Sequence, residues 1–219
     1  TYGLGFQVTK ELIEDDQYEV AMQKGARALA FSIRQTKEIL AALVYDRAFN
    51  ASFLGADLVA LGSSAHLNVA GGTYSNILAT ASDLSEASLE QAVIDLMNYT
   101  NDRALNIAVM PQSLIIPVEL WAEAEKIMRT PTEVGTANNT VNVVRGKFPK
   151  GVKINHYLTD VDAWFIRTNV KDGMKYFSRR DDTFDMDDDF DTDNAKYKAT
   201  FRCAFGWSDP RGIFLTAGA

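Results

Sequence analysis

Residues 16–50 read DQYEVAMQKGARALAFSIRQTKEILAALVYDRAFN, and the fold depends on this stretch. Asp16 and Glu19 have the spacing of a capping box, which satisfies the free amide donors at the start of a helix. Beyond them, mostly apolar residues recur at alternating steps of four and three: Met22, Ala26, Leu29, Ile33, Thr36, Leu40 and Leu43. Charged and polar side chains occupy the other faces, so the pattern predicts an amphipathic helix.

The predicted helix is several times longer than an average globular helix of about 11 residues. No proline interrupts it, and Asn50-Ala51-Ser52 is the first stretch that would end it. Gly25 costs about 1 kcal/mol relative to alanine, which burial of the apolar stripe should outweigh. At about 1.5 Å per residue the helix would be about 50 Å long. That length suits either a core helix of an α/β enzyme or a spine that crosses a flat, extended subunit assembling with its own copies.

The composition describes a folded protein of one or two domains. The chain has 219 residues, of which 47% are hydrophobic and 23% charged, and this balance excludes a disordered protein. No apolar run approaches the roughly 18 residues of a membrane span, and no signal-peptide pattern opens the chain, so we expect a soluble protein without a membrane partner. Cys203 is the only cysteine, so an intrachain disulfide or a cysteine-rich zinc site is excluded. Because Thr1 opens directly into a strand pattern, we expect an N-terminal portion to precede it.

The net charge of −7 arises from one local feature. Residues 181–193 contain eight aspartates and no base, and the rest of the chain is close to neutral. The largest basic cluster is the pair Arg179-Arg180. A general nucleic-acid-binding surface needs clustered lysine and arginine, so the sequence argues against one.

The N-terminal residues predict a strand and a short turn. Apolar and small or polar residues alternate from Tyr2 to Thr9, which is typical of a half-exposed strand. We expect its pairing partner to lie upstream or in another subunit. Residues 9–13 are predicted to form a short helical turn before the long helix.

Two further helices and several strands are predicted downstream. Asp83 and Glu86 repeat the capping-box spacing before a helix that ends near Asn98, and a second amphipathic helix begins with Pro117 in its first turn and ends near Thr130-Pro131. The predicted strands are 58–61, 105–110, 141–144, 152–156, 163–166, 196–207 and 213–215, with turns between them. Alternating strands and helices predict an α/β or α+β layer.

Three small patterns suggest binding chemistry, and each has a simpler structural explanation. Gly71-Gly72-Thr73 could cradle a phosphate, but the Walker spacing and its lysine are absent. His66 could ligate a metal, but the only other histidine is His156, so a loop histidine with a local hydrogen bond is favoured. Asp160 and Asp162 form an Asp-Val-Asp segment that is typical of a turn.

The aspartate run is the strongest candidate for a cation site. Five of its residues fall at every second position and would project from one face of an extended chain: Asp185, Asp187, Asp189, Asp191 and Asp193. An EF-hand loop does not fit, because Phe190 and Lys196 stand where its glycine and bidentate glutamate belong. We therefore favour a solvated acidic edge that deters aggregation or pairs with a basic patch on a neighbouring subunit.

Three segments together resemble the Mu-like major head subunits of tailed bacteriophages. They are residues 3–16, which read GLGFQVTKELIEDD, the loop from His66 to Asn76, and the tail from Phe184 to Gly206. The resemblance spans nearly the whole chain and includes the order of the motifs. It implies an α+β fold of the Hong Kong 97 type, with a long spine helix, a peripheral domain and an axial domain.

The resemblance implies an arrangement of domains and a departure from the complete family pattern. Residues 1–15 would be the returning strand at the end of an extended loop, 16–52 the spine helix, 53–169 the axial domain, and 170–219 the peripheral-domain strands and C-terminus. The N-terminal arm and the outgoing loop strand are absent from this sequence. Some relatives crosslink their subunits through lysine and asparagine, but no such pair can be matched here. We therefore assign no catalytic, cofactor-binding or metal residues, and expect no enzyme activity.

The function implied is that of a major capsid protein, which assembles with itself through hexamers and pentamers into an icosahedral shell around double-stranded DNA. Portal, scaffolding or decoration proteins would be its other partners, the DNA would be enclosed without sequence-specific binding, and assembly would take place in the cytoplasm of a bacterial host. Two alternatives remain open from the sequence. One is the shell of an encapsulin-type compartment, and the other is a cation-dependent hydrolase that uses Asp185 to Asp193.

Overall fold

The computed structural model describes residues 1–15, 18–132, 140–189 and 191–219. Helices and strands are mixed along the chain, as expected for the α+β class. The chain divides into two compact units: the first comprises Thr1–Ala41 and Tyr176–Phe205, and the second Ala42–Lys175 and Gly206–Ala219. Among the described residues, no helix has the length and apolar character needed to span a membrane.

The long helix is confirmed. Helix α2 runs over 29 residues, Tyr18–Asp46, which is about 44 Å at 1.5 Å per residue. Its expected start at Asp16 lies outside the described residues. The expected end at Asn50 was wrong, because the helix closes after Asp46 with tighter turns in which Ala48 N donates to Tyr45 O and Asn50 N to Arg47 O.

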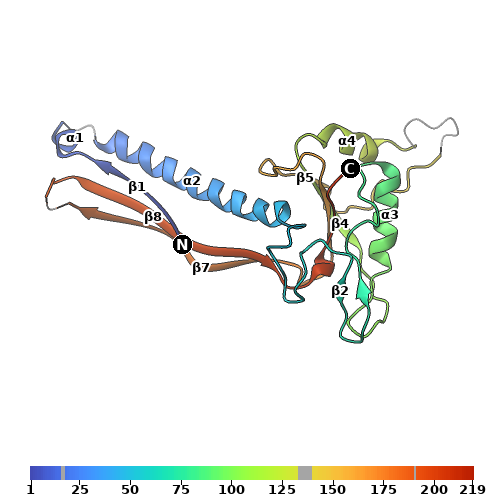
Figure 1. Ribbon diagram of the computed structural model, residues 1–219. Helices are drawn as coiled ribbons and strands as arrows, with labels where there is room; N and C mark the ends of the chain where they lie inside the picture. Colours follow the sequence, from blue (N-terminus) through green and yellow to red (C-terminus); the bar gives the residue numbers. More distant parts are fainter. Residues whose placement is uncertain (16–17, 133–139, 190) are drawn as a thin grey trace. The chain divides into compact units, whose positions relative to one another are not determined.

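The first unit holds a three-stranded sheet in the order β1-β8-β7 (Figure 1). These strands are Tyr2–Val8, Ala195–Trp207 and Met174–Asp188. The expectation that the N-terminal strand pairs upstream or with another subunit was wrong. Strand β1 pairs antiparallel with β8 of the same chain, with Tyr2 opposite Phe201 and Val8 opposite Ala195.

One face of this sheet packs against α2. Phe6 stacks on Tyr197 with ring centroids 4.9 Å apart. Gly25 lies directly on the Phe6 ring, since a Cβ at this position would come within 2.8 Å of its carbons. Four residues of β8 at alternate positions are buried: Ala195, Tyr197, Ala199 and Phe201. The short helix α1, Lys10–Glu14, connects β1 to α2 and is capped by Thr9, whose hydroxyl accepts from Leu12 N.

The second unit is built on a four-stranded sheet in the order β5-β4-β6-β9. These strands are Val152–Ile154, Pro111–Ile116, Trp164–Thr168 and Ile213–Thr216, and only the β4–β5 pair is parallel. Both faces of the sheet are buried. One face carries Leu114, Trp164, Ile166 and Phe214 into a core shared with α3 (Glu86–Met97) and α4 (Trp121–Arg129). The other face carries Ile115, Phe165, Ile213 and Leu215 into a core with Ala48 and Leu61.

Three predicted strands were wrong. Residues 58–61 form a bent loop in which Leu58 has a positive φ of 61°. Residues 105–110 precede the real strand, which begins at Pro111, a residue that a strand tolerates at its first position. Residues 141–144 contribute only an isolated bridge between Val141 and Thr132.

The N-cap residue predicted for α3 was wrong. Asp83 is not the cap; Ser85 is the N-cap, and it exchanges hydrogen bonds with Ser88 in a reciprocal capping box. The expected helix end at Asn98 is confirmed. The strand predicted at 152–156 is shorter, and those at 163–166, 196–207 and 213–215 correspond to β6, β8 and β9.

Candidate functional site

Polar and charged side chains gather in one cluster in each unit. The first cluster is the aspartate hairpin, formed by β7, β8 and the residues between them. The second is the Arg211 junction, formed by Arg211 and the loops around residues 57–76 and 100–106.

The tip of the aspartate hairpin is held together by lysines. The Lys196 ammonium lies 2.6 Å from Asp189, which also accepts from the Thr192 hydroxyl at 2.9 Å. These two hydrogen bonds hold the pKa of the Asp189 carboxyl below its usual value. Lys10 lies 2.7 Å from Asp193, and its hydrogen bond with that carboxylate raises the lysine pKa. The tip is therefore clamped both to β8 and to the start of α1.

The alternating aspartates do not share one face. Asp185 and Asp187 belong to β7, but that strand ends at Asp188 and the chain turns back before Ala195. In the turn, Asp189 N donates to Asn194 O and Asp193 adopts a positive φ of 52°. Phe190, which the comparison with an EF-hand used, lies outside the described residues. Among the described residues, no three His, Cys, Asp or Glu side chains gather as a metal site would require.

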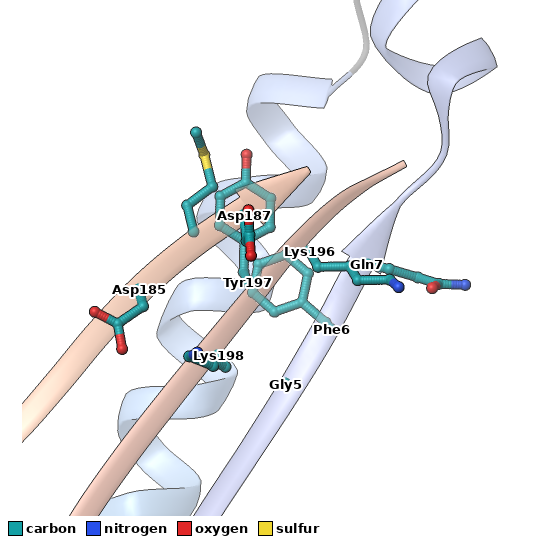
Figure 2. Close-up of a pocket in the computed structure, with 9 residues that line it drawn as sticks. Gly5, Phe6, Gln7, Asp185, Asp187, Lys196, Tyr197 and Lys198 are labelled. Carbon is teal, nitrogen blue, oxygen red and sulfur yellow. The ribbon is translucent and has the colours of Figure 1, made fainter. Parts of the chain in front are cut away.

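The face of the sheet that carries Asp185 and Asp187 holds an alternation of charge (Figure 2). Thr183 and Thr200 lie opposite each other with hydroxyls 2.8 Å apart. In an antiparallel hairpin this contact puts Asp185 opposite Lys198 and Asp187 opposite Lys196. A cavity of about 520 Å³ on this surface is lined by these four residues together with Gly5, Phe6, Gln7, Met186 and Tyr197.

A further ion pair ties the hairpin to α2 within the first unit. The Lys37 ammonium lies 2.6 Å from Asp182 and sits 5.1 Å from the centre of the Phe201 ring. The hydrogen bond with Asp182 raises the pKa of Lys37. The acidic run is thus a hairpin partly neutralised by lysines of its own chain, whereas the sequence interpretation placed the bases on a neighbouring subunit.

The Arg211 junction is centred on a buried guanidinium with 7% exposure. Its Nε donates to Thr100 O at 2.8 Å, and its Nη2 donates to Asn68 at 2.8 Å and to Asp102 at 2.9 Å. The guanidinium also stacks over the Tyr74 ring, 4.2 Å from its centre. One side chain therefore joins the loop that contains residue 68 to the loop that contains residue 102.

His66 supports the same junction from the hairpin of β2 (His66–Leu67) and β3 (Thr73–Tyr74). The ring is fully buried, with Nδ1 2.6 Å from Asp57 and Nε2 3.1 Å from Leu61 O. Asn76 donates to the same carbonyl at 2.6 Å. The predicted local hydrogen bond of His66 is present, but the residue opens strand β2 instead of lying in a loop. The Asp160 turn is also confirmed, because its carboxylate accepts from Asp162 N.

Sequence reasoning missed Arg211, which we took as part of an ordinary turn. No local pattern marks it, because its partners lie 109 and 143 residues away in the chain. It also missed the surface that the junction presents. Leu67, Val69 and Leu105 are 64%, 90% and 61% exposed on loops that the junction holds together. Three exposed apolar side chains on fixed loops suit contact with another protein surface.

Comparison with known proteins gives one family and several structural neighbours. A family model described as phage capsid protein matches residues 1–216. No curated protein matches the chain.

Three solved structures illustrate the structural likeness. A virus-like particle from Pyrococcus furiosus is 15% identical, with a TM-score of 0.51 over 98% of this chain and 75% of that chain. A structure from Mycobacterium phage Che8 is 14% identical, with a TM-score of 0.51 over 100% and 71% of the two chains. A holo encapsulin complex from Synechococcus elongatus is 10% identical, with a TM-score of 0.54 over 98% and 72%. The likeness confirms the α+β fold of the Hong Kong 97 type that the sequence implied.

Proposed function

The chain belongs to a family of phage capsid proteins and is a major capsid protein, and we propose that its copies close into the icosahedral shell around the double-stranded DNA genome of a tailed bacteriophage. The match over residues 1–216 is the observation that carries this proposal, because it covers both units. The virion capsid is where the protein resides, and we place its assembly in the cytoplasm of the bacterial host.

The two units have separate roles in this proposal. The first unit, with α2 on its three-stranded sheet, is the peripheral domain and the end of the extended loop. The second unit is the axial domain. This assignment moves residues 206–219 out of the peripheral range expected from the sequence, because β9 pairs with β6 of the second sheet.

The axial domain places its loops at the centre of each hexamer and pentamer. The exposed Leu67, Val69 and Leu105 support this role, because they give adjacent copies an apolar surface to bury. The Arg211 junction keeps both loops in one conformation, which lowers the entropy that ordering would cost on assembly. Each interface between two copies contributes a modest binding free energy, and closure of the shell makes these interfaces cooperative.

The shell has no chemistry of its own in this proposal. The chain is acidic overall, and Lys10, Lys37 and Lys196 are engaged by carboxylates of the aspartate hairpin. A shell with this charge attracts DNA phosphates weakly, so the packed genome is enclosed without sequence-specific binding. Portal, scaffolding and decoration proteins are its further partners.

A protein compartment that holds an enzyme is the second candidate, because an encapsulin is among the structural neighbours. The content of particles purified from an infected or induced host separates the two. Nuclease-protected double-stranded DNA of one genome length supports the phage head. Particles that contain a host enzyme and no protected DNA would contradict it.

A further inference from the structure

We propose that strand β7 is an interface between copies, at which β7 of one subunit pairs antiparallel with β7 of a second copy about a two-fold axis. The inference rests on the proposed shell and names one contact within it. In the part of the chain that the structure describes, β7 has β8 on one side and forms the edge of the sheet on the other (Figure 1). Unpaired backbone donors and acceptors along such an edge are a template for another strand.

The side chains of β7 are exposed over nearly its whole length. Its apolar residues Tyr176, Phe177, Phe184 and Met186 are 50%, 52%, 51% and 62% exposed. Aromatic pairs across neighbouring strands are among the more stabilising contacts in a sheet. A second strand along this edge of 15 residues would cover these side chains and pair the free backbone groups.

The charges of β7 are divided into two halves, and this division selects the partner. The strand reads MKYFSRRDDTFDMDD, so its bases lie in the first half and its acids in the second. A parallel copy would place like charges opposite each other, which is destabilising. An antiparallel copy places the basic half of each strand opposite the acidic half of the other. The sequence of β7 is therefore complementary to itself in one direction only.

The geometry of a two-fold axis also restricts the register. Such an axis stands perpendicular to the sheet, so residues that face the same side must lie opposite each other. A register centred on Arg180 satisfies this condition, at the cost of one like-charge contact in which Arg180 lies opposite its own copy on the axis. It places Arg179 opposite Asp181 and Tyr176 opposite Phe184, and each pair occurs twice by symmetry.

The next register, centred on Asp181, is less suitable because its charges are already engaged. It would place Arg180 opposite Asp182. Within the subunit Asp182 is bound by Lys37 at 2.6 Å, and Arg180 donates to the Thr200 hydroxyl at 3.1 Å.

An apolar groove beside β7 supports the same register. The groove has a volume of about 180 Å³ and lies between α2 and β7. Ala26, Ala30 and Ile33 line it from the helix, and Phe184 lines it from the strand. A tyrosine of the second copy opposite Phe184 would cover the groove and remove its apolar surface from water.

Cysteine crosslinking tests the contact, because a residue on a two-fold axis meets its own copy. We would place single cysteines at position 180, 181 or 177 in a Cys203→Ser background and oxidise the assembled particles gently. Arg180→Cys is expected to give disulfide-linked dimers, since residues opposite each other bring their Cβ atoms close to disulfide distance. Asp181→Cys and Phe177→Cys are the matched controls and should stay monomeric. Particles in which Arg180→Cys stays monomeric, or in which Asp181→Cys links instead, would overturn the proposal.

Charge exchange tests the pairing that the register predicts. In the Arg180→Cys background, Arg179→Asp or Asp181→Arg should lower the crosslinked fraction about five-fold, the factor for roughly 1 kcal/mol. The double variant exchanges the two charges and should restore the crosslink, and failure to restore it would overturn the pairing. If the unmodified protein forms no particles at all, the proposed function and this inference both fail. If particles form and the crosslink does not, only the inference fails.

Discussion

Arg211 and Asp102, separated by 109 residues of sequence, meet with Nη2 2.9 Å from Oδ1. The arginine is buried whereas the aspartate is 60% exposed, so the pair reaches from the core of the second unit to its surface. The contact fixes the loop that carries Leu105, and Ala70 N donates to Asp102 O at 2.9 Å to bring in the loop that carries Val69. The surface proposed to meet other copies thus depends on one guanidinium.

Removal of Arg211 should destabilise the protein strongly. Arg211→Ala leaves Thr100 O, Asn68 and Asp102 without their donor. Because hydrogen bonds to a charged group contribute about 1.5–3 kcal/mol each, we expect a loss of at least about 3 kcal/mol in the free energy of unfolding. Arg211→Lys keeps the charge but not the planar fork, so its loss should be smaller, about 1–3 kcal/mol. Chemical denaturation measures both. Arg103→Ala, on the exposed part of the same loop, is the control and should stay within about 0.5 kcal/mol of the parent. An Arg211→Ala protein as stable as that control would contradict the role given to the junction.

Gly25 should resist replacement although it lies within a helix. Alanine at an ordinary helical position is favoured by about 1 kcal/mol over glycine. Here a Cβ would come within 2.6 Å of the Phe6 ring, so we expect Gly25→Ala to lower the unfolding free energy by about 1–3 kcal/mol. Phe6→Leu in the Gly25→Ala background replaces the ring with a smaller side chain and should recover part of the lost unfolding free energy. A stabilised single variant would show that Phe6 does not pack against α2 as described.

The turn of the aspartate hairpin should weaken in acid. The hydrogen bond from Lys196 lowers the pKa of Asp189 below its ordinary value of 3.8, so the carboxylate stabilises the folded state above that pH. The stabilisation is lost as pH falls through the lower folded value. The melting-temperature difference between the parent and Asp189→Asn should therefore be constant from neutral pH to about pH 5 and shrink below about pH 4. A difference that is unchanged at pH 3 would contradict the assignment.

Reversal of charge at the hairpin should affect assembly more than folding. Asp187→Lys with Asp189→Lys removes two carboxylates beside Lys196 and adds two bases to a face that already carries Lys198. Asp187 is exposed and Asp189 lies in the turn beyond β7, so the isolated subunit should keep its fold, whereas an interface between many copies repeats the repulsion at every contact. We expect near-normal circular dichroism and a sharp drop in particles counted by electron microscopy. An unchanged particle yield would count against a role for the hairpin in assembly.

The sequence predicted best those helices and strands in which a hydrophobic pattern repeats over many residues. The alternation of Met22, Ala26 and Leu29 continued for enough turns to predict α2, and the strand predicted at 196–207 corresponds to β8. Strand β4 was missed, because a strand buried on both faces shows no alternation and Pro111 was read as a stop. The register of β1 with β8 joins residues about 200 positions apart, and no local pattern specifies such a pairing.

The polar clusters were predictable only in part. The acidity of residues 181–193 is visible in the composition, and so is the absence of a base within them. Two of the lysines that neutralise the run, Lys10 and Lys37, belong to α1 and α2. Only the fold shows that they lie beside the aspartates. In the sequence alone, Arg211 is likewise an ordinary turn residue. Its function as a junction exists only once the chain has brought Asn68, Tyr74 and Asp102 around it.

The central claim is that this protein acts through contacts between its own copies. Electron cryomicroscopy of the purified full-length protein, with sedimentation velocity on the same sample, tests it most directly. We predict closed icosahedral particles in which α2 is one continuous helix from Tyr18 to Asp46 and in which Leu67, Val69 and Leu105 face neighbouring subunits. A protein that sediments only as a monomer at high concentration, with α2 broken into short helices, would contradict the account.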